Sequence, residues 1–434
     1  MRKVLIITYY WIPSGGSGVQ RWVKFVKYLR DFGWEPVIYA PENADYPVID
    51  ASFEDDVPAG ITVIRRPIWE PYALYRRFTG KKDKAIQAGF VSDSKERDWK
   101  DKLSVWLRGN LFIPDPRKFW VRPAVKYLKQ YVEQHPVDAI ITNGPPHSMH
   151  LIGLKLKRIF PKIPWIADFR DPWTNIDFYK ELHLTKWADA KNHRLECKVI
   201  QGADAVTVVS AGMREEFESK YTTQIYVIPN GFDDQDMKID APALDDCFSI
   251  SHIGTMNAAR NPIVLWQALQ QLCDEQKIMK SELKIQLIGK VDFAVIEAVD
   301  SYGLQDCLVK TEYLKHDQAI QKQQSSQVLL LLINQTPNAK SILTGKFFEY
   351  LASNRPVIGV GPKDGDAARI LQETGAGIMI DYEDVDGMKK VLLDYYKQYQ
   401  QKALTLKTTS VTQFSRKNLT KELSNLINQL TTHA

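Results

Sequence analysis

The apolar positions of the chain fall into short continuous runs separated by longer stretches with a helical period. The first run, 4–8, is followed by a glycine-rich loop and by a stretch, 19–32, whose apolar residues recur every three or four positions. A second apolar run, 36–40, comes directly afterwards. Continuous apolar runs are typical of strands buried on both faces, and their alternation with helices indicates a parallel sheet. The pattern therefore predicts an α/β fold.

The same alternation continues along the whole chain. A length of 434 residues exceeds what one hydrophobic core usually serves, so we expect two domains of about 200 residues. The acidic run 234–246, which contains Pro242, is interpreted as the linker, with the first domain at 1–233 and the second at 247–413. Further strands are expected at 61–65, 138–142, 165–167, 205–209, 248–253, 284–288, 328–333 and 357–360. Further helices are expected at 99–111, 123–134, 150–160, 211–220, 262–275, 346–353 and 414–430.

Composition is that of an ordinary globular protein, with 25% charged and 44% hydrophobic residues. The four cysteines, Cys197, Cys247, Cys273 and Cys307, are scattered without a C-x-x-C pair. They indicate reduced thiols of a cytosolic protein rather than a metal site or a disulfide framework. The first residues are interpreted as a strand and not as a signal peptide, and no apolar segment approaches the roughly 20 residues that span a bilayer. We expect a cytoplasmic protein, soluble or peripheral on the inner face of the membrane.

Positive charge is concentrated in the first half of the chain. Residues 1–230 hold 35 Lys and Arg against 27 Asp and Glu, and residues 65–130 hold 17 against 7. Basic side chains among interfacial aromatics suit an anionic membrane surface, but a solvated basic face with ordinary core aromatics is an equal alternative. No nucleic-acid motif accompanies them, so we expect no nucleic-acid partner. The aromatic residues in question are Trp69, Tyr72, Tyr75, Phe78, Trp99, Trp106, Phe112, Phe119 and Trp120.

One stretch, 341–360, carries the most chemical information. Thr344 and Gly345 end a polar loop and open the helix 346–353, which stops before the strand 357–360. A helix N-terminus after a small-residue loop offers free N–H groups and a positive dipole end, which suit a phosphate. Lys346 adds a full positive charge at this position. The stretch is therefore a candidate phosphate site.

Glu349 lies among apolar residues of the same helix. A carboxylate in a half-buried position needs hydrogen-bonding partners, or its burial costs several kcal/mol. Sugar hydroxyls, such as those of a ribose, can donate to it. The alternative, an amphipathic helix whose Glu349 faces water, is equally compatible with the residues alone.

Candidate ligand-binding residues also follow the predicted strands of the first domain. Gly15 and Gly16 follow the first strand, but the loop lacks the G-x-G-x-x-G spacing of dinucleotide-binding folds. His147 follows the strand 138–142, although a lone histidine in a loop is more often a surface residue. Arg170 and Asp171 follow the strand 165–167 and form either a structural ion pair or part of an acceptor site. All these strand ends lie where open α/β sheets bind ligands.

Two basic residues of the second domain occupy comparable positions. Arg260 lies in a loop that starts at Gly254 and leads into a helix, which makes it a candidate diphosphate clamp. Lys290 follows Gly289 at the end of the strand 284–288 and is a weaker candidate.

Two motifs mark a family resemblance. The Gly-Lys-Phe-Phe-Glu-Tyr segment from Gly345, together with Ile-Pro-Asn-Gly-x-Asp at 228–233, resembles the retaining GT-B glycosyltransferases of family 4. The resemblance implies the GT-B fold: two Rossmann-like parallel-sheet domains facing a central cleft, with the terminal helix 414–434 packing back on the first domain. Glu349 matches the second glutamate of the family's E-x7-E pattern, which binds the donor ribose. Ser341 stands in place of the first glutamate.

The resemblance also implies roles for the other candidates. The preceding loop, with Thr344, Gly345 and Lys346, would hold the diphosphate, and Arg260 occupies the position of a donor-binding Lys or Arg. The family has a second basic residue in this loop. Thr255 stands in its place here, and Lys290 would partly substitute for it. The remaining implied contacts are Gly15, Gly16 and Asn230 to the donor, and His147 as a catalytic-site histidine.

The implied activity is transfer of a hexosyl or related group from a nucleoside-diphosphate sugar to a glycan or polyprenyl-linked acceptor. The segments 145–148 and 168–173 resemble a bacterial subgroup that acts in surface-polysaccharide assembly. Retention of configuration, with no metal or other cofactor, is expected. Catalysis would then rest on His147, Arg260, Lys346 and Glu349. Three alternatives stay open: a nucleotide-sugar epimerase or hydrolase of the same fold, a noncatalytic nucleotide-sugar-binding subunit because of Ser341, and an NAD-dependent oxidoreductase, which the glycine spacing argues against.

Overall fold

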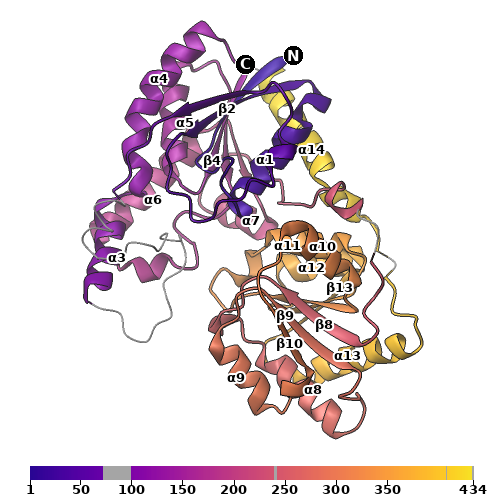
Figure 1. Cartoon of the computed structure of the whole chain (residues 1–434). Coiled ribbons are helices and arrows are strands. Elements are labelled where there is room, and N and C mark those ends of the chain that lie inside the picture. Colours follow the sequence, from indigo (N-terminus) through magenta and orange to yellow (C-terminus); the bar gives the residue numbers. More distant parts are fainter. Residues whose placement is uncertain (72–98, 239–241, 407, 433–434) are drawn as a thin grey trace. The chain divides into compact units, whose positions relative to one another are not determined.

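The computed structural model describes residues 1–71, 99–238, 242–406 and 408–432 of the chain (Figure 1). The chain divides into two compact units. The first consists of Met1–Pro229 with Arg416–Ala434, and the second of Asn230–Ser415. Each unit is built on one parallel sheet, as the alternation of apolar runs and helices predicts.

The sheet of the first unit has seven strands in the order β3-β2-β1-β4-β5-β6-β7, all paired in parallel. Its central strand, β1, pairs with β2 and β4, so that Ile6 lies beside Ile38 and Ile141. The strands span Arg2–Ile7 (β1), Trp34–Pro41 (β2), Thr62–Arg66 (β3), Ala139–Gly144 (β4), Trp165–Phe169 (β5), Ala205–Val208 (β6) and Ile225–Val227 (β7).

Helices cover both faces of this sheet because successive strand residues point to opposite sides. Leu5 and Ile7 face a core shared with α4 (Val121–Gln134), α5 (Ser148–Ile159) and α6 (Lys186–Gly202). Val4 and Ile6 face a second core. That core is shared with α1 (Ser17–Leu29) and α14 (Arg416–Thr432), which lie side by side (Figure 1). The unit is completed by α3 (Trp99–Leu111) and α7 (Ala211–Glu218).

The sheet of the second unit has six strands in the order β10-β9-β8-β11-β12-β13, again all parallel. The strands span Phe248–Ile253 (β8), Leu283–Ile288 (β9), Leu308–Thr311 (β10), Val328–Leu332 (β11), Val357–Val360 (β12) and Gly377–Ile380 (β13). The helices span Ile263–Asp274 (α8), Phe293–Ser301 (α9), His316–Ser325 (α10), Gly345–Ala352 (α11), Asp366–Thr374 (α12) and Val385–Gln400 (α13). Here too β11 contributes alternate residues to two cores, one shared with α8 and α13 and the other with α11 and α12.

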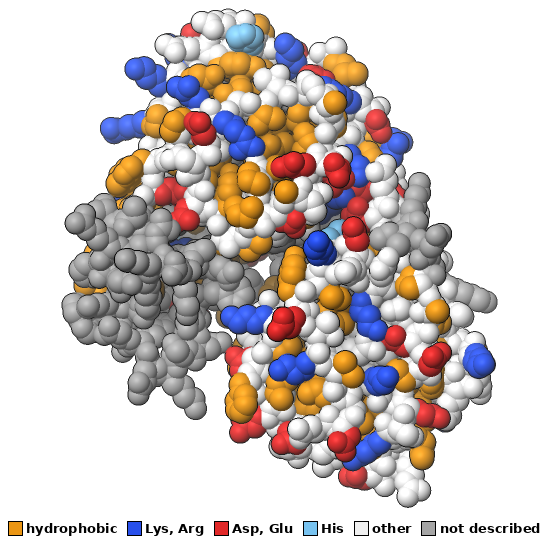
Figure 2. All heavy atoms as spheres, in the orientation of Figure 1, with side chains coloured by type: hydrophobic (Ala, Val, Ile, Leu, Met, Phe, Trp, Pro, Cys, Tyr) orange, Lys and Arg blue, Asp and Glu red, His pale blue; other side chains and the backbone are white. Residues whose placement is uncertain are grey.

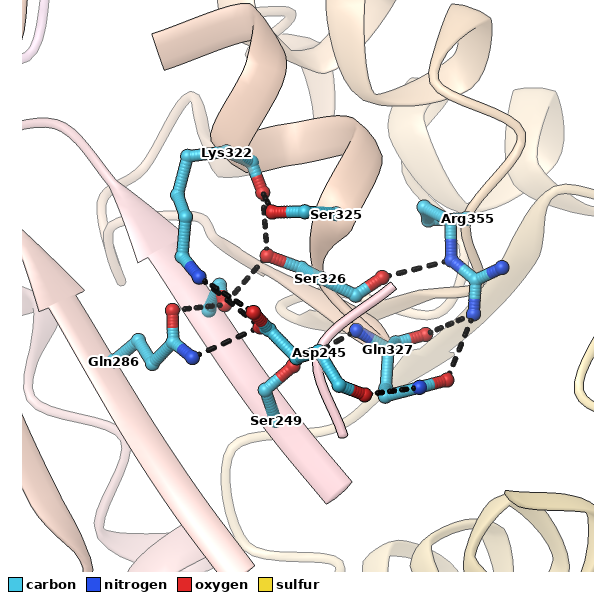
Figure 3. A network of polar contacts seen from close by, with 9 residues as sticks. Asp245, Ser249, Gln286, Lys322, Ser325, Ser326, Gln327 and Arg355 are labelled. Carbon is cyan, nitrogen blue, oxygen red and sulfur yellow. Dashed lines mark hydrogen bonds and ion pairs between the residues drawn. The ribbon is translucent and has the colours of Figure 1, made fainter. Parts of the chain in front are cut away.

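The prediction of a linker at 234–246 is wrong. The boundary between the units lies after Pro229, and the described part of the predicted linker belongs to the second unit. Asp245 forms an ion pair with Lys322 at 2.9 Å and accepts a hydrogen bond from Gln286 at 2.9 Å (Figure 3). Its carbonyl oxygen accepts from the Gln327 amide at 2.7 Å. Asp245, one of the acidic residues that suggested a solvated linker, instead takes part in this polar network.

Arg355 closes the same network from the other side (Figure 3). Its guanidinium donates to the carbonyl oxygens of Ser326 and Gln327 at 2.7 and 3.0 Å. These residues join the end of α10 to the start of β11. The network therefore fixes α10, which carries one of the site residues described below.

Candidate functional site

The carboxyl ends of β8 and β9 meet at two glycines of the second unit. Gly254 and Gly289 have φ values of +123° and +113°, which L side chains rarely adopt. A Cβ atom at residue 289 would lie 2.9 Å from the Gly254 carbonyl oxygen. This close backbone approach starts the loop that carries Arg260, at the edge of the sheet where open α/β folds bind ligands.

Lys346 lies at the start of α11 and reaches the end of β8. Its Nζ donates to the Nε2 atom of His252 at 3.2 Å and to the carbonyl oxygen of Ile253 at 3.3 Å. The pKa of Lys346 is lowered to about 7, mainly by burial and also by the charge of Arg260, while Glu349 partly offsets both. Tyr350 accepts a hydrogen bond from the Ile253 N–H at 3.0 Å, which also joins α11 to β8.

The N-terminus of α11 is open. Thr344 is the N-cap residue, but its side chain makes no capping hydrogen bond, and the first turn holds no acidic residue. The Thr344 hydroxyl oxygen is buried without a hydrogen-bond partner among the described residues. The first N–H groups of a helix have no partner within the helix, so they remain available to a bound group. Together with Lys346 they favour an anion.

Arg260 belongs to the same cluster. Its Nε donates to the Asn334 side chain at 2.6 Å, and its NH1 donates to the carbonyl oxygen of Thr255 at 3.3 Å. Its charge lowers the pKa values of both Lys346 and His252, which places the three groups within electrostatic reach of one another. Lys290 is exposed, and its carbonyl oxygen accepts from the Met256 N–H at 2.9 Å, so its backbone borders this loop.

Glu349 lies three residues after Lys346, on the same side of α11. Its side chain is half-buried, and its Oε2 atom accepts a hydrogen bond from the Gln323 amide at 3.0 Å. Gln323 is 1% exposed and lies on α10, next to the network around Lys322. The carboxylate is thus held from one side by a buried amide. Ser341 ends a short 3₁₀ turn, Ala339–Ser341, in the loop before α11.

In the first unit, His147 is buried at the start of α5. Its ring stacks on Trp173 with centroids 4.8 Å apart, and its side chain is 8% exposed. Burial lowers the pKa of His147 well below its ordinary value, and the charges of His150 and Arg170 lower it further. Its Nδ1 atom has no hydrogen-bond partner in the described part of the chain. His147 is therefore a neutral, buried ring rather than a surface residue.

His150 is a second buried histidine at this edge, and the sequence interpretation missed it. Its Nδ1 atom is 2.9 Å from the Thr142 hydroxyl, and burial lowers its pKa to about 3. A Cβ atom at Gly144 would lie 2.4 Å from its Nε2 atom and 3.0 Å from His147 Nδ1. Only glycine fits between the two rings. The spacing of His147 and His150 by three residues at a helix start was the one signal in the sequence.

Arg170 and Asp171 form an ion pair at 3.0 Å, and the Asp171 side chain is 41% exposed. The Arg170 NH1 atom is buried and lacks a hydrogen-bond partner among the described residues. It lies against the first turn of α1, since a Cβ atom at Gly18 would be 2.9 Å away. Gly16, with φ +82°, is the N-cap residue of α1, and Gly15 packs against Asp50. The predicted ion pair is therefore present, and one guanidinium nitrogen of Arg170, NH1, has no hydrogen-bond partner among the described residues.

Asp168, in contrast, is fully committed to the fold. Its two oxygens accept from the Arg21 guanidinium at 2.8 and 3.0 Å, and also from Trp22 and Thr207. Arg21 also donates to the carbonyl oxygens of Ile228 and Pro229, directly before Asn230. A buried ion pair with all its hydrogen bonds satisfied is a structural element, here one that joins α1, β5 and the end of β7.

The structure thus groups Arg260, Thr344, Gly345, Lys346 and Glu349 in the second unit, and Gly16, His147 and Arg170 at one sheet edge of the first. Asn230 is half-buried at the first position of the second unit. Across the described residues, no group of three or more His, Cys, Asp or Glu side chains is arranged to hold a metal ion. Nor is any described helix long and apolar enough to cross a membrane.

Two parallel-sheet units of this kind define the GT-B fold, and comparison with solved structures confirms it. Sucrose-phosphate synthase of Thermosynechococcus elongatus superposes with a TM-score of 0.57 at 16% identity, covering 100% of both chains. HepE of Anabaena, in complex with UDP and glucose, gives 0.61 at 14% identity, covering 99% of this chain and 100% of the other. A Listeria monocytogenes protein described as a putative UDP-N-acetylglucosamine 2-epimerase gives 0.56 at 11% identity, covering 100% and 97%.

Residues 85–236 match the family model described as Glycosyltransferase Family 4. No curated protein sequence matches the chain. The matched segment covers the first unit from residue 85 to Pro229, including His147 and Arg170, and extends past Asn230 into the second unit. Together with the GT-B fold, this match supports a glycosyltransferase.

Proposed function

We propose that the protein transfers a sugar from a nucleoside-diphosphate donor, with the donor bound at the start of α11. One observation carries this proposal: Lys346 lies at the open N-terminus of α11 within electrostatic reach of Arg260, and Glu349 follows on the same side of the helix. The basic groups and the N–H groups would bind the diphosphate. Glu349 would accept hydrogen bonds from the ribose hydroxyls. Gly15, Gly16, Lys290 and Asn230 are proposed as further donor contacts.

The proposed reaction breaks the bond between the anomeric carbon and the diphosphate oxygen. Negative charge develops on the leaving nucleoside diphosphate, and preorganised positive groups stabilise such charge without reorganising. Arg260, Lys346 and the α11 N-terminus would supply this stabilisation without a metal ion. An acceptor hydroxyl then attacks the anomeric carbon with retention of configuration, and its proton passes to the departing diphosphate oxygen. In the first unit, His147 is proposed to position the sugar or acceptor, and Arg170 with Asp171 to contact the acceptor.

We further propose that the acceptor is a glycan or a polyprenyl-linked sugar of bacterial surface-polysaccharide assembly. This rests on the sequence resemblance of the segments around His147 and Arg170. The donor class is supported by HepE, a protein of the same fold that was crystallised with UDP and glucose. The fold itself does not separate a transferase from an epimerase, since the Listeria monocytogenes neighbour is described as the latter. Requirement for an acceptor separates them: an epimerase or hydrolase would consume donor without one.

A thermal-shift panel tests the donor site. We expect one of UDP, GDP and CMP to raise the melting temperature of the wild-type protein, because a ligand that binds only the folded state stabilises it. The shift should be larger than that given by NAD and should be lost in the Glu349→Ala variant. Stabilisation by NAD alone would instead favour an oxidoreductase. Donor binding without turnover in the presence of any acceptor would favour the noncatalytic subunit.

We also propose that the first unit docks on an anionic membrane surface. Trp69 and Phe119 are 56% and 42% exposed and contact each other, with centroids 4.8 Å apart. The Lys118 Nζ lies 5.2 Å from the Phe119 ring centroid, and burial together with the charge of Lys191 lowers the pKa of Lys118. Lys191 in turn lies 4.5 Å from the centroid of the Trp187 ring, which is 63% exposed. Tyr72, Tyr75 and Phe78 of the predicted basic region lie outside the described residues.

Vesicle binding tests this docking surface. Over the face shown in Figure 2, basic and acidic side chains are interspersed, so a local aromatic and basic cluster rather than a uniform positive face has to carry the interaction. We expect cosedimentation with vesicles that contain about 30% anionic lipid, weakening severalfold between about 0.05 M and about 0.5 M salt. A Lys118→Glu variant should bind severalfold more weakly. Equal binding to neutral vesicles, or none at all, would leave this surface as a solvated face.

A further inference from the structure

His252 is a buried histidine that the proposed donor chemistry does not use. It lies in β8 and is 0% exposed. Its Nδ1 atom is 3.0 Å from the carbonyl oxygen of Leu330 in the neighbouring strand, and its Nε2 atom is 3.2 Å from the Nζ atom of Lys346. A polar side chain in the middle of a sheet core therefore bridges β11 and the first turn of α11.

We assign the tautomer of the ring from these two hydrogen-bond partners; the backbone of Thr255 also contacts the ring. A carbonyl oxygen only accepts, so Nδ1 carries the proton and donates to Leu330. Lys346 only donates, so Nε2 must offer its lone pair to the ammonium group. Burial lowers the pKa of His252 well below its ordinary value, and the charges of Lys346 and Arg260 lower it further. The imidazole is thus a neutral acceptor wherever Lys346 is charged.

A neutral acceptor has a specific consequence for Lys346. The second protein acceptor of its ammonium group, the carbonyl oxygen of Ile253, is neutral as well. Among the described residues, the hydrogen-bond partners of Lys346 are these two neutral groups, and Glu349 acts on it only through its charge. Two of the three ammonium protons are therefore held by neutral groups, which fix the direction of the side chain. The third proton and the whole positive charge remain available to a ligand.

A carboxylate at position 252 would hold Lys346 in the same place, but the positive charge of Lys346 would then no longer be available to a ligand. It would neutralise the ammonium group and compete with an incoming anion, because opposite charges in a low-dielectric site attract strongly. Gly254 borders this arrangement, since a Cβ atom there would be in ordinary contact with Lys346 Nζ at 3.4 Å.

We propose that His252 is a positioning residue. It orients the Lys346 ammonium group as a neutral hydrogen-bond acceptor, so that the positive charge of Lys346 can pair with the phosphate groups of the donor. The inference rests on the proposed donor site, because it assigns a role to a residue that acts through Lys346. It adds a residue that acts from behind that site, in the buried strand β8.

The matched variants His252→Gln and His252→Glu test the proposal. Both side chains have the same length, and they differ in charge. Inorganic pyrophosphate is the probe, because it reports on the anion site independently of the nucleobase; binding is measured by calorimetry. We expect His252→Gln to bind within about threefold of wild type, and His252→Glu to bind at least about tenfold more weakly, as one charge-assisted hydrogen bond requires.

Equal affinity of the two variants would overturn the role of His252. Circular dichroism and the melting temperature without ligand show whether each variant is folded. If His252→Glu does not fold, His252→Leu replaces it: loss of the acceptor should then weaken pyrophosphate binding relative to His252→Gln, and equal binding would again refute the proposal. Failure of the donor site itself is distinguishable, because the wild-type protein would then bind neither pyrophosphate nor any nucleoside diphosphate.

Discussion

Replacing Glu349 by alanine is expected to weaken binding of the preferred nucleoside diphosphate by about 10- to 100-fold. The range corresponds to the roughly 1.5 to 3 kcal/mol that a hydrogen bond to a charged group contributes. Because Glu349 lies three residues beyond Lys346 and would contact the ribose, binding of pyrophosphate should change by less than about threefold. Calorimetric titration with the nucleoside diphosphate and with pyrophosphate measures both effects.

Two further variants sharpen this test. Glu349→Gln keeps the size of the side chain and one acceptor oxygen, so it should retain more affinity than Glu349→Ala. Glu297→Ala removes an exposed carboxylate from α9 and should leave both affinities unchanged. The melting temperature without ligand controls for the loss of the Gln323 hydrogen bond. If Glu349→Ala weakened pyrophosphate and nucleoside diphosphate equally, the carboxylate would be organising the anion site rather than binding a ribose.

The elements that carry this site can be predicted from the sequence because their signals are local. The apolar run Val357–Val360 predicts a strand with the bounds that β12 has, and α11 begins one residue earlier than the pattern predicts. A polar loop, a small residue and an apolar helical period all lie within a dozen residues there. For the same reason the amino-acid pattern alone indicates Thr344, Gly345, Lys346 and Glu349 as candidates.

The groups behind the site could not be predicted, because their partners are distant in sequence. His252 and Lys346 are 94 residues apart, and Gln323 and Glu349 are 26 apart. His252 lies in a segment whose pattern indicates only a strand, and Gln323 lies in α10, for which the sequence pattern predicts no element. The linker prediction failed in the same way: acidic residues near Asp245 looked solvated, but its partner Lys322 is 77 residues away. The composition of a segment indicates whether it is polar, but it does not show which distant residues its side chains will contact.

The resemblance to a glycosyltransferase family contributed what local patterns could not, namely roles for His147 and Asn230. The structure adds a physical reason to consider His147 a ligand-binding residue. His147 and His150 are both buried and neutral, and each has one nitrogen without a partner among the described residues. Unsatisfied buried polar atoms are costly, so their presence at a strand end favours a binding role.

Lys346→Met is expected to weaken binding of the nucleoside diphosphate by about 100-fold at about pH 6.5, since in the proposed donor site it removes a half-buried charge that would pair with the diphosphate. Methionine is unbranched and apolar, so it can fill the space of the lysine stem. Lys397→Met, which removes an exposed positive charge from α13, is the matched control and should change the affinity by less than about threefold.

The pH dependence of this loss identifies Lys346 as the responsible group. Its pKa is lowered to about 7 from 10.5, so without ligand it is charged below that value and becomes neutral as the pH rises through it. Only the charged form pairs with phosphate, so binding must be accompanied by proton uptake at higher pH. Wild-type affinity should therefore fall between about pH 7 and about pH 9, by up to about tenfold per pH unit.

The Lys346→Met variant should lack this fall, because methionine does not titrate. The ratio of the two affinities cancels the ionisation of the ligand, which is the same for both proteins. We expect the ratio to decline from about 100 near pH 6.5 towards about 1 near pH 9, where the wild-type lysine is largely neutral before binding. A ratio independent of pH would contradict this prediction. It would mean that Lys346 does not lose its charge between about pH 6.5 and about pH 9.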